Sequence, residues 1–225
     1  MRVAIYHTPP YAHPLTKPGA DWLGRCAFTG APKVSPIAPE LTASARRYGF
    51  HATIRAPFRL AEGSDLGALE ERLSDLCAKA APIVFERLAL AELGQFLALV
   101  AEPQPEALAL LQRQILELAE PFRAPLSEAE IARRKPQRLT DRQRHYLEQW
   151  GYPYVLKDFR FHMTLTESLE PIVRRDVADK ARAHFAEFID RPYRLDALAL
   201  FVEPAAGADF TIRSIHPFGQ AARKG

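Results

Sequence analysis

The chain has 225 residues, of which 48% are apolar and 25% are charged, and its formal net charge is +3. This composition is typical of a soluble globular protein with a sizeable core, and so small a net charge implies no general attraction to nucleic acid. The apolar runs are too short for a membrane span or a signal peptide. Cys26 and Cys77 have no metal-binding or redox spacing. These features predict a cytoplasmic protein without a membrane partner or a disulfide scaffold.

The predicted elements alternate along the chain without long linkers. A strand at 3–7 precedes an irregular stretch at 8–18, which contains four prolines. Apolar periodicity and turn residues then predict, in chain order, a helix at 38–46, a strand at 48–60, a helix at 65–80, a hairpin of 83–91 with 95–102, helices at 106–120 and 127–150, a strand at 155–169, a helix at 171–189 and a hairpin of 193–202 with 209–217. Pro136 is expected to break the segment 127–150, and Thr140 to cap its second half.

Positive charge is concentrated between residues 133 and 144. The segment contains six basic residues and one acidic residue: Arg133, Arg134, Lys135, Arg138, Arg142 and Arg144, with Asp141. Such a run is compatible with a solvated helix or loop, and also with a surface that faces an anion or a partner.

The order of strand, helix and hairpin occurs twice, and each copy begins with a similar strand. The first strand reads Phe50-His51-Ala52-Thr53-Ile54 and the second reads Phe161-His162-Met163-Thr164-Leu165, so the histidines are 162 − 51 = 111 residues apart. The repeat predicts a single bilobal α+β domain over 1–225. Its pseudo-symmetric lobes are expected at roughly 30–125 and 150–218, with some exchange of strands and a basic helical insertion at about 127–150.

Alternation along a strand gives each motif one polar and one apolar face. The residues that share a polar face are His51, Thr53 and Arg55 in the first strand and Arg160, His162 and Thr164 in the second. Their apolar neighbours point the other way, into a core. If the lobes pack with the polar faces opposed, a cleft forms with one histidine on each wall.

Paired histidines and threonines suit in-line displacement at a phosphodiester. A neutral imidazole takes a proton from the attacking oxygen, and an imidazolium gives a proton to the leaving oxygen. Both forms are available near neutral pH, because histidine ordinarily titrates at about 6.5. Threonine hydroxyls can donate hydrogen bonds to the non-bridging oxygens. The chain contains no His-Glu-x-x-His motif or His/Cys cluster, so no metal or other cofactor is expected.

The two motifs resemble those of the 2H phosphoesterase superfamily, which includes cyclic nucleotide phosphodiesterases and bacterial RNA ligase-like proteins. Other segments resemble its DUF1045 branch, whose members are often called phosphonate metabolism proteins: Tyr6, Trp22-Leu23-Gly24-Arg25, Arg47-Tyr48-Gly49, Pro57-Phe58, Leu139-Thr140 and Phe159. The resemblance implies the bilobal 2H fold, with two antiparallel sheets and outer helices around a central cleft. It also implies a phosphoesterase that opens a small cyclic sugar phosphate, such as 5-phosphoribosyl 1,2-cyclic phosphate.

We therefore expect four catalytic residues: His51, Thr53, His162 and Thr164. Six more residues are candidates for substrate binding: Arg55 and Arg160 as phosphate ligands, Tyr6 and Tyr48 as partners of a sugar or base, and Trp22 and Arg25 in a loop over the cleft. Each of the six also has a structural interpretation, as an edge arginine or a packed aromatic residue. The sequence does not assign the base, because the two motifs are near copies.

Two other functions are compatible with the sequence. An RNA-end enzyme of the same chemistry could hold a phosphate backbone on the basic segment 133–144. We rank it second, because the segment lacks the alternating aromatic residues on which single strands stack. The third is a sensor that binds a phosphorylated ligand without turnover. For a small substrate, reversing the charges of Arg133 and Arg134 is expected to leave turnover nearly unchanged.

Overall fold

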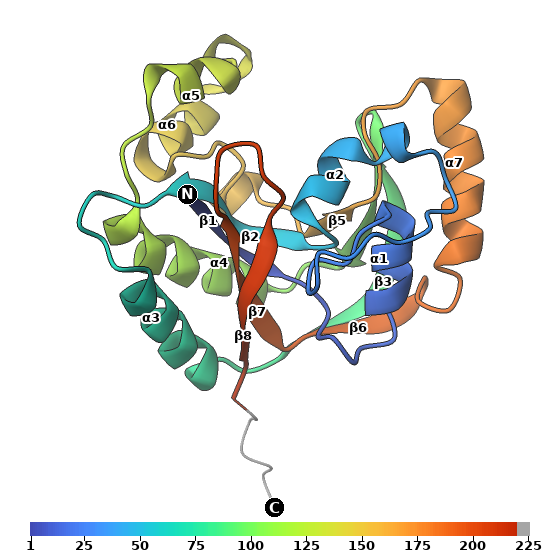
Figure 1. The fold of residues 1–225 in the computed structure, drawn as a ribbon, viewed down its shortest axis with the longest axis horizontal. Helices are drawn as coiled ribbons and strands as arrows, with labels where there is room; N and C mark the ends of the chain where they lie inside the picture. Colours follow the sequence, from blue (N-terminus) through green and yellow to red (C-terminus); the bar gives the residue numbers. More distant parts are fainter. Residues whose placement is uncertain (220–225) are drawn as a thin grey trace, which may run out of the picture.

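Eight antiparallel strands form one sheet in the computed structural model, which describes residues 1–219 (Figure 1). The strands are β1 (Arg2–His7), β2 (Ala52–Arg59), β3 (Ile83–Leu93), β4 (Phe96–Glu102), β5 (His162–Thr164), β6 (Arg191–Leu195), β7 (Ala197–Glu203) and β8 (Thr211–Pro217). The α-helices are α1 (Thr16–Leu23), α2 (Ala43–Tyr48), α3 (Leu66–Lys79), α4 (Glu106–Ala119), α5 (Glu128–Arg133), α6 (Asp141–Trp150) and α7 (Pro171–His184). The expected α+β class with antiparallel strands is confirmed.

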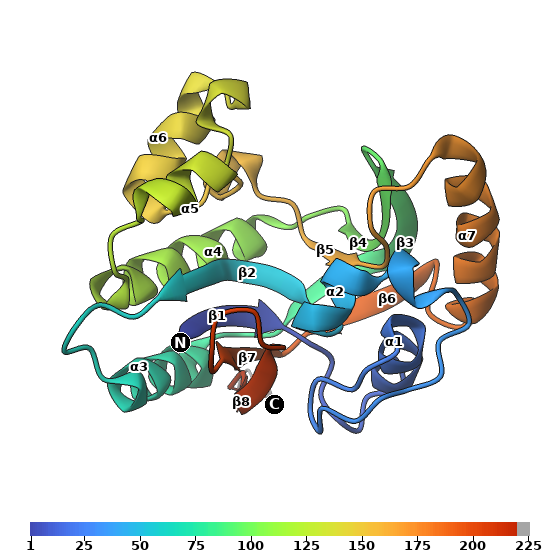
Figure 2. The same ribbon diagram turned by 45° about the horizontal axis from the view of Figure 1, so that its top comes forward.

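The pairing of β2 with β5 joins two halves of four strands each. The strand order is β6-β3-β4-β5-β2-β1-β7-β8, and Ala52 lies opposite Met163 at the junction. The two expected sheets are thus halves of one continuous, curved sheet (Figure 2). Each half takes strands from both stretches, 30–125 and 150–218, which is the exchange of strands that was expected. The reason is that the β3–β4 hairpin lies beside β5, whereas β7 and β8 return to the side of β1.

Helices cover the two halves from outside. α3 contacts β7 and β8, α4 contacts β2, and α7 contacts β3 and β4. Figure 2 shows α5 and α6 above one end of β2 and α2 at its other end. Residues 127–150 are helical apart from a break around Pro136, and the Thr140 hydroxyl caps α6 by accepting the Gln143 N–H, both as expected.

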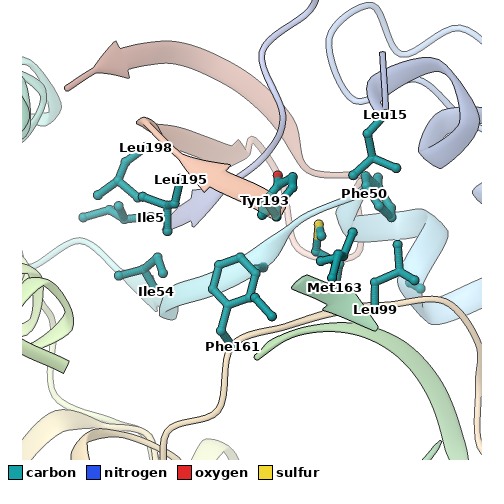
Figure 3. Packing of buried hydrophobic residues seen from close by; sticks show 14 of the residues in the cluster. Ile5, Leu15, Phe50, Ile54, Leu99, Phe161, Met163, Tyr193, Leu195 and Leu198 are labelled. Atoms are coloured by element: carbon teal, nitrogen blue, oxygen red, sulfur yellow. The ribbon is translucent and has the colours of Figure 1, made fainter. Parts of the chain in front are cut away.

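The core lies on the apolar side of the motif strands. The residues between and beside the motif positions are all buried: Phe50, Ala52, Ile54, Phe161, Met163 and Leu165. Figure 3 shows Ile54, Phe161 and Met163 gathered with Ile5 of β1 and Leu198 of β7. Burying a large apolar side chain contributes roughly 1.5–3 kcal/mol. The same burial therefore fixes the histidines and threonines on the opposite face.

Two expected elements have different bounds in the structure. α1 begins at Thr16, inside the stretch 8–18 that was expected to be irregular. Pro18 is tolerated because it occupies the first turn, where a missing N–H breaks no helical hydrogen bond. The strand expected at 155–169 is reduced to β5, because Leu156 adopts a φ of +53° and a short 3-10 turn covers 156–158.

The stretch 193–202 is two strands instead of one, because the chain crosses between the halves of the sheet at Asp196. A buried histidine stabilises this crossing. His7 Nδ1 donates to the Ala197 carbonyl at 2.9 Å, and its Nε2 accepts from the Tyr193 hydroxyl at 2.6 Å. Burial lowers the pKa of His7 to about 4, so the ring is neutral near pH 7.

We expect acid to destabilise the fold in part through His7. Its pKa is about 4 when folded and 6.5 in the reference state. The free energy of unfolding should therefore fall as the pH drops from 6.5 to 4, by on the order of 3 kcal/mol for this group. The slope of the unfolding free energy against pH reports how many protons are taken up on unfolding. Urea denaturation of His7→Gln should give a shallower slope than the wild type between pH 5 and 6, equivalent to roughly one proton fewer. The exposed His145→Gln is the control, and an unchanged slope in His7→Gln would contradict the assignment.

Candidate active site

A cavity of about 360 Å³, here called the motif cavity, opens on the polar face of the β2–β5 junction. His51 and Thr53 line it from the β2 side, and His162 and Thr164 line it from β5. The other walls come from β1, α2, the segment after β5 and the segments before and after α6. The structure therefore brings together the four side chains that were expected to be catalytic.

The strand register sets each histidine against the threonine of the other motif. The antiparallel pairing of β2 with β5 places Thr53 opposite His162 and His51 opposite Thr164. Side chains directly opposite each other on one face have Cβ atoms about 4.5–5.5 Å apart. A small anion in the motif cavity would therefore have a histidine and a threonine on each side.

Backbone carbonyls orient both imidazole rings in the same way. His51 Nδ1 lies 2.8 Å from the Gly49 carbonyl, and His162 Nδ1 lies 2.8 Å from the Arg160 carbonyl. A carbonyl oxygen can only accept, so each Nδ1 carries the hydrogen and each neutral ring has its lone pair on Nε2. His51 Nε2 lies 3.2 Å from the Thr53 hydroxyl. Each ring can therefore exchange a proton through Nε2 while its orientation is held through Nδ1.

The environment favours the neutral form of both rings. Burial lowers the pKa of His51 to about 4, against the opposing effect of the hydrogen bond to the Gly49 carbonyl. Burial also lowers the pKa of His162 from its usual value, and the nearby Arg160 charge acts in the same direction. An anion bound between the rings would raise both pKa values, because a negative charge favours imidazolium.

Two of the candidate substrate ligands, Tyr6 and Tyr48, line the motif cavity. The Tyr6 ring stacks on His51 at a centroid distance of 3.8 Å and an interplanar angle of 24°. Burial raises the pKa of the Tyr6 hydroxyl, so it remains a neutral donor. Tyr48 is half-buried, and its ring lies 6.1 Å from that of His51. Tyr6 thus supports the His51 ring, and Tyr48 forms the neighbouring wall.

Trp22 and Arg25 lie outside the motif cavity and hold its walls from behind. The Trp22 indole N–H donates to the Leu165 carbonyl at 2.9 Å, which fixes the chain just after β5. The buried Arg25 guanidinium donates to two carbonyls in the last turn of α2 and to one just before β8. Neither side chain covers the cleft as expected; both position the backbone that carries the motifs.

Arg55 points away from the motif cavity because of a β-bulge. Thr53 pairs with Tyr6, but Arg55 pairs with the adjacent Ile5, so β2 contains one extra residue at this point. The bulge turns Arg55 toward the buried side, where it donates to Glu120 at 3.1 Å and to a carbonyl at the end of α6. Strict alternation along the sequence places Arg55 beside Thr53, and nothing in the sequence signals the bulge.

Arg160 contributes its carbonyl to the site and its side chain to an adjoining cavity of about 670 Å³. Its guanidinium is half-exposed and lies 3.8 Å from Glu102. This adjoining cavity shares a wall with the motif cavity, including Thr53 and His162. Its aromatic lining consists of Phe96, Tyr152, Tyr154 and Phe159.

Two arginines that were not among the expected site residues, Arg2 and Arg134, also line the motif cavity. Arg2 could have been found, because alternation along β1 places it on the same face as Tyr6. Arg134 belongs to the basic segment, and its guanidinium lies 4.9 Å from the centre of the Tyr152 ring. Its place in the wall makes charge reversal at Arg134 a test of whether the substrate reaches this part of the motif cavity.

Two other arginines of the basic segment pair with acidic side chains. Arg142 pairs with Asp158 at 2.8 Å, and Arg144 pairs with Asp141. Within residues 1–219, no group of three or more His, Cys, Asp and Glu side chains is placed to hold a metal ion. No helix in that part of the chain is long and apolar enough to cross a membrane.

Comparisons with known proteins identify a family and two relatives that match most of the chain. The model of a protein family of unknown function, DUF1045, matches residues 53–211. A protein from Janthinobacterium sp. (strain Marseille), titled ribose 1,5-bisphosphate phosphokinase PhnN, is 36% identical over 237 residues, which cover 99% of this chain. A protein of the same title from Laribacter hongkongensis (strain HLHK9) is 38% identical over 94% of the chain. The chain spans about half the length of these relatives, 52% and 50%.

The solved structures that this chain matches have low sequence identity to it. E. coli LigT complexed with phosphate is 11% identical, with a TM-score of 0.48 over 97% of this chain and 98% of that one. TT0787 of Thermus thermophilus is 14% identical, with a TM-score of 0.48 over the same shares.

We expect Gly49→Ala to disturb the site more than a glycine substitution elsewhere. Gly49 has a φ of +79°, and an added Cβ would lie 2.5 Å from the Ala27 Cβ. Gly94→Ala is the control, because Gly94 has a φ of +64° with no atom within 4 Å of an added Cβ. A positive φ adds a backbone cost to both variants, and the cost is expected to be larger at Gly49, whose ψ of 173° lies in a region essentially restricted to glycine. Gly49→Ala should lose more unfolding free energy and also shift the imidazole ¹⁵N signals of His51. Equal losses and an unshifted His51 would contradict this.

Proposed function

We propose that this chain, which belongs to the DUF1045 family, is a phosphoesterase that hydrolyses a small cyclic phosphodiester by acid–base catalysis between His51 and His162. One observation carries the proposal. Two pseudo-symmetric histidines have Nδ1 fixed on a carbonyl and line one cavity together, each opposite a threonine of the other motif. This arrangement supplies a base, an acid and two hydroxyl donors around a space of the size of a small sugar phosphate.

The reaction that suits this geometry is an in-line attack of water on the phosphorus. The base takes a proton from the water as the water oxygen bonds to phosphorus. The acid protonates the leaving ester oxygen of the cyclic phosphate as the bond between that oxygen and phosphorus breaks. The product is a phosphate monoester with a free hydroxyl. After the reaction the base ring is protonated and the acid ring is neutral. Proton exchange with solvent must restore the starting protonation states before the next turnover.

We assign the base to His51 and the acid to His162. His51 is half-buried and stacked on Tyr6, and burial lowers its pKa to about 4. His162 has its pKa lowered as well, but its ring lies at the boundary with the larger adjoining cavity, where solvent and anions reach it. The microstate with neutral His51 and protonated His162 is therefore the more populated of the two productive states. The bound phosphodiester stabilises that proton.

Thr53 and Thr164 fit the role of donors to the non-bridging oxygens. Both line the motif cavity, and each lies across the sheet from the histidine of the other strand. A hydroxyl on a short, β-branched side chain loses little freedom on binding and stabilises negative charge as it develops on the phosphoryl oxygens.

The titles of the curated relatives favour a ribose phosphate as the substrate. Both titles name ribose 1,5-bisphosphate, and opening a 1,2-cyclic phosphate of ribose 5-phosphate would produce that compound. This chain contains no G-x-x-x-x-G-K-S/T loop for a nucleoside triphosphate, so we do not extend the kinase title to it. We therefore propose 5-phosphoribosyl 1,2-cyclic phosphate as the substrate.

A second candidate substrate is a nucleoside 2′,3′-cyclic phosphate, free or at an RNA end. The observation that favours it is the adjoining 670 Å³ cavity, whose aromatic side chains could stack a base next to His162. The RNA form is less favoured, because Arg142 and Arg144 of the basic segment already pair with acidic side chains.

A panel of cyclic phosphates tests the activity itself. Ribose 1,2-cyclic phosphates and nucleoside 2′,3′-cyclic phosphates should be hydrolysed by the wild type with EDTA present, because proton transfer is assigned to the two imidazoles. His51→Gln and His162→Gln should each lower kcat by roughly 10²–10⁴. If both variants still bind a product monoester while the wild type turns over none of the panel, the chain is a sensor. Activity lost in EDTA and restored by a divalent ion would refute this mechanism.

The pH profile should show two limbs and a maximum in the mildly acidic range. The rate kcat/KM reports the free enzyme, in which His51 has a pKa of about 4 and His162 a pKa below its usual 6.5. Activity should fall below the first value as the base protonates, and should fall above the second as the acid loses its proton. The limbs belong to the coupled pair. For kcat the alkaline limb should move upward, because bound phosphate favours imidazolium. A single limb would contradict the two-histidine scheme.

Substitution of the threonines should separate hydrogen bonding from proton transfer. Thr53→Val and Thr164→Val keep the side-chain shape but remove the hydroxyl, and each should lower kcat by roughly 10-fold or more, since one transition-state donor is lost. The pH profile should keep its shape, because threonine does not titrate. Thr211→Val, at an exposed position of β8, is the control. A shifted limb in either motif variant would show that the hydroxyl acts through the histidine.

A further inference from the structure

We infer that Arg2 and Arg134 form a second anion subsite at the far end of the motif cavity. It would bind a phosphate monoester that the substrate carries apart from the scissile diester. The inference rests on the proposed function and deepens it, because it assigns the residues that would recognise the terminal phosphate of a sugar cyclic phosphodiester.

The first support is the position of the two arginines relative to the histidines. Tyr6 stacks on His51 at one end of β1, and Arg2 lies at the other end, yet both line the motif cavity. The four intervening steps of about 3.3 Å separate their Cα atoms by about 13 Å. Because Arg2 also lines the motif cavity, this separation leaves room for roughly one sugar ring between its guanidinium and the motif pair.

The second support is positive charge in excess of its acidic partners, because one carboxylate, that of Glu203, pairs with both Arg2 and Arg47. Arg2 uses Nε and Nη2 on the buried Glu203 carboxylate, and its Nη1 has no hydrogen bond to residues 1–219. Arg134 makes no ion pair within that part of the chain. One face of its guanidinium packs over the Tyr152 ring at 4.9 Å, which leaves the N–H edges available. A planar fork held in this way is suited to phosphate oxygens.

The third support is the way in which α5 is fixed. Ser127 and Glu130 form a capping box at its start, and Glu130 also pairs with Arg59 at the end of β2 at 3.1 Å. These contacts attach the helix to the sheet that carries His51. Arg134 follows the last turn of α5, so its position relative to the histidines is set before a ligand binds.

The surroundings extend the positive potential beyond the subsite. A neighbouring cavity of about 330 Å³ shares Arg2 with the motif cavity. Four arginines and two glutamates line it: Arg2, Arg47, Arg59 and Arg133, with Glu130 and Glu203. Arg133 makes no ion pair within residues 1–219, so the excess charge lies on the side of α5. Such a field would attract a doubly charged monoester more strongly than the singly charged diester.

Matched substrates isolate the second phosphate. The assay compares ribose 1,2-cyclic phosphate with its 5-phosphorylated counterpart, and the readout is the ratio of their kcat/KM values. Three proteins are needed: the wild type, Arg134→Gln, and Arg138→Gln. Arg138 is exposed, belongs to the same basic segment and lies outside the described cavities, so its loss removes the same charge without touching the subsite.

The wild type should prefer the 5-phosphorylated substrate, and Arg134→Gln should reduce that preference by roughly 10- to 100-fold, the worth of a charge-assisted hydrogen bond. Arg138→Gln should keep the preference within about twofold, because an exposed charge outside the subsite is screened. A wild-type ratio near one, a ratio unchanged in Arg134→Gln, or an equal loss in Arg138→Gln would overturn the inference.

A binding measurement separates this inference from the proposed activity. Ribose 5-phosphate carries the terminal phosphate but no cyclic diester, and calorimetry gives its Kd without turnover. Its Kd should rise roughly 10-fold or more in Arg134→Gln and stay near the wild-type value in Arg138→Gln. If no cyclic phosphate is hydrolysed but this difference is found, the activity is wrong and the subsite stands. Equal Kd values in all three proteins would remove the subsite.

Discussion

The short antiparallel contact between β2 and β5 is the constraint on which the site depends. Side chains alternate along both strands, so a slip of one residue would send the histidines and threonines into the core and bring Ala52 and Met163 out to the cavity. The slip is opposed by the burial of the apolar motif residues, which pack against β1 and β7. β5 is only three residues long, and its pairing with β4 on the other side holds the register, with Leu99 opposite Met163.

A second layer of contacts converts this register into oriented rings. The carbonyl that holds His51 belongs to Gly49, whose close approach to Ala27 and positive φ exclude other residues. Arg25 and Trp22 hold the backbone on either side of the junction. The cost is that two imidazoles are desolvated beside each other, which favours their neutral forms. Proton occupancy in the site is thus coupled to the arrival of an anion.

Much of this could be predicted from the sequence, because it follows from local periodicity. The two motifs, their apolar neighbours, the long helices and the capping of α6 by Thr140 are all encoded within a few residues. The failures are non-local. The bulge that turns Arg55 inward depends on how β1 and β2 fit together, and the break at Asp196 depends on strands far away in the sequence. Arg134 enters the motif cavity because an ion pair between Arg59 and Glu130 docks α5, and no pattern within the basic segment shows that.

The interleaving of the two halves of the sheet has a consequence for how the chain acquires its structure. β1 pairs with β7, so Arg2 lies opposite Glu203. β1 is also the neighbour of β2 on the side away from β5, so the half-sheet beside β2 is complete only when β7 has paired with β1. Contacts between such distant residues slow folding, because a long loop must close before they form. At roughly 5–20 residues per second, a ribosome needs about 10–40 s to synthesise the stretch between β1 and β7. During that time the first histidine strand lacks its completed half-sheet and β1 has an unpaired edge, so nascent chains of this protein are expected to be inactive and to depend on protection from aggregation until the last hairpin emerges.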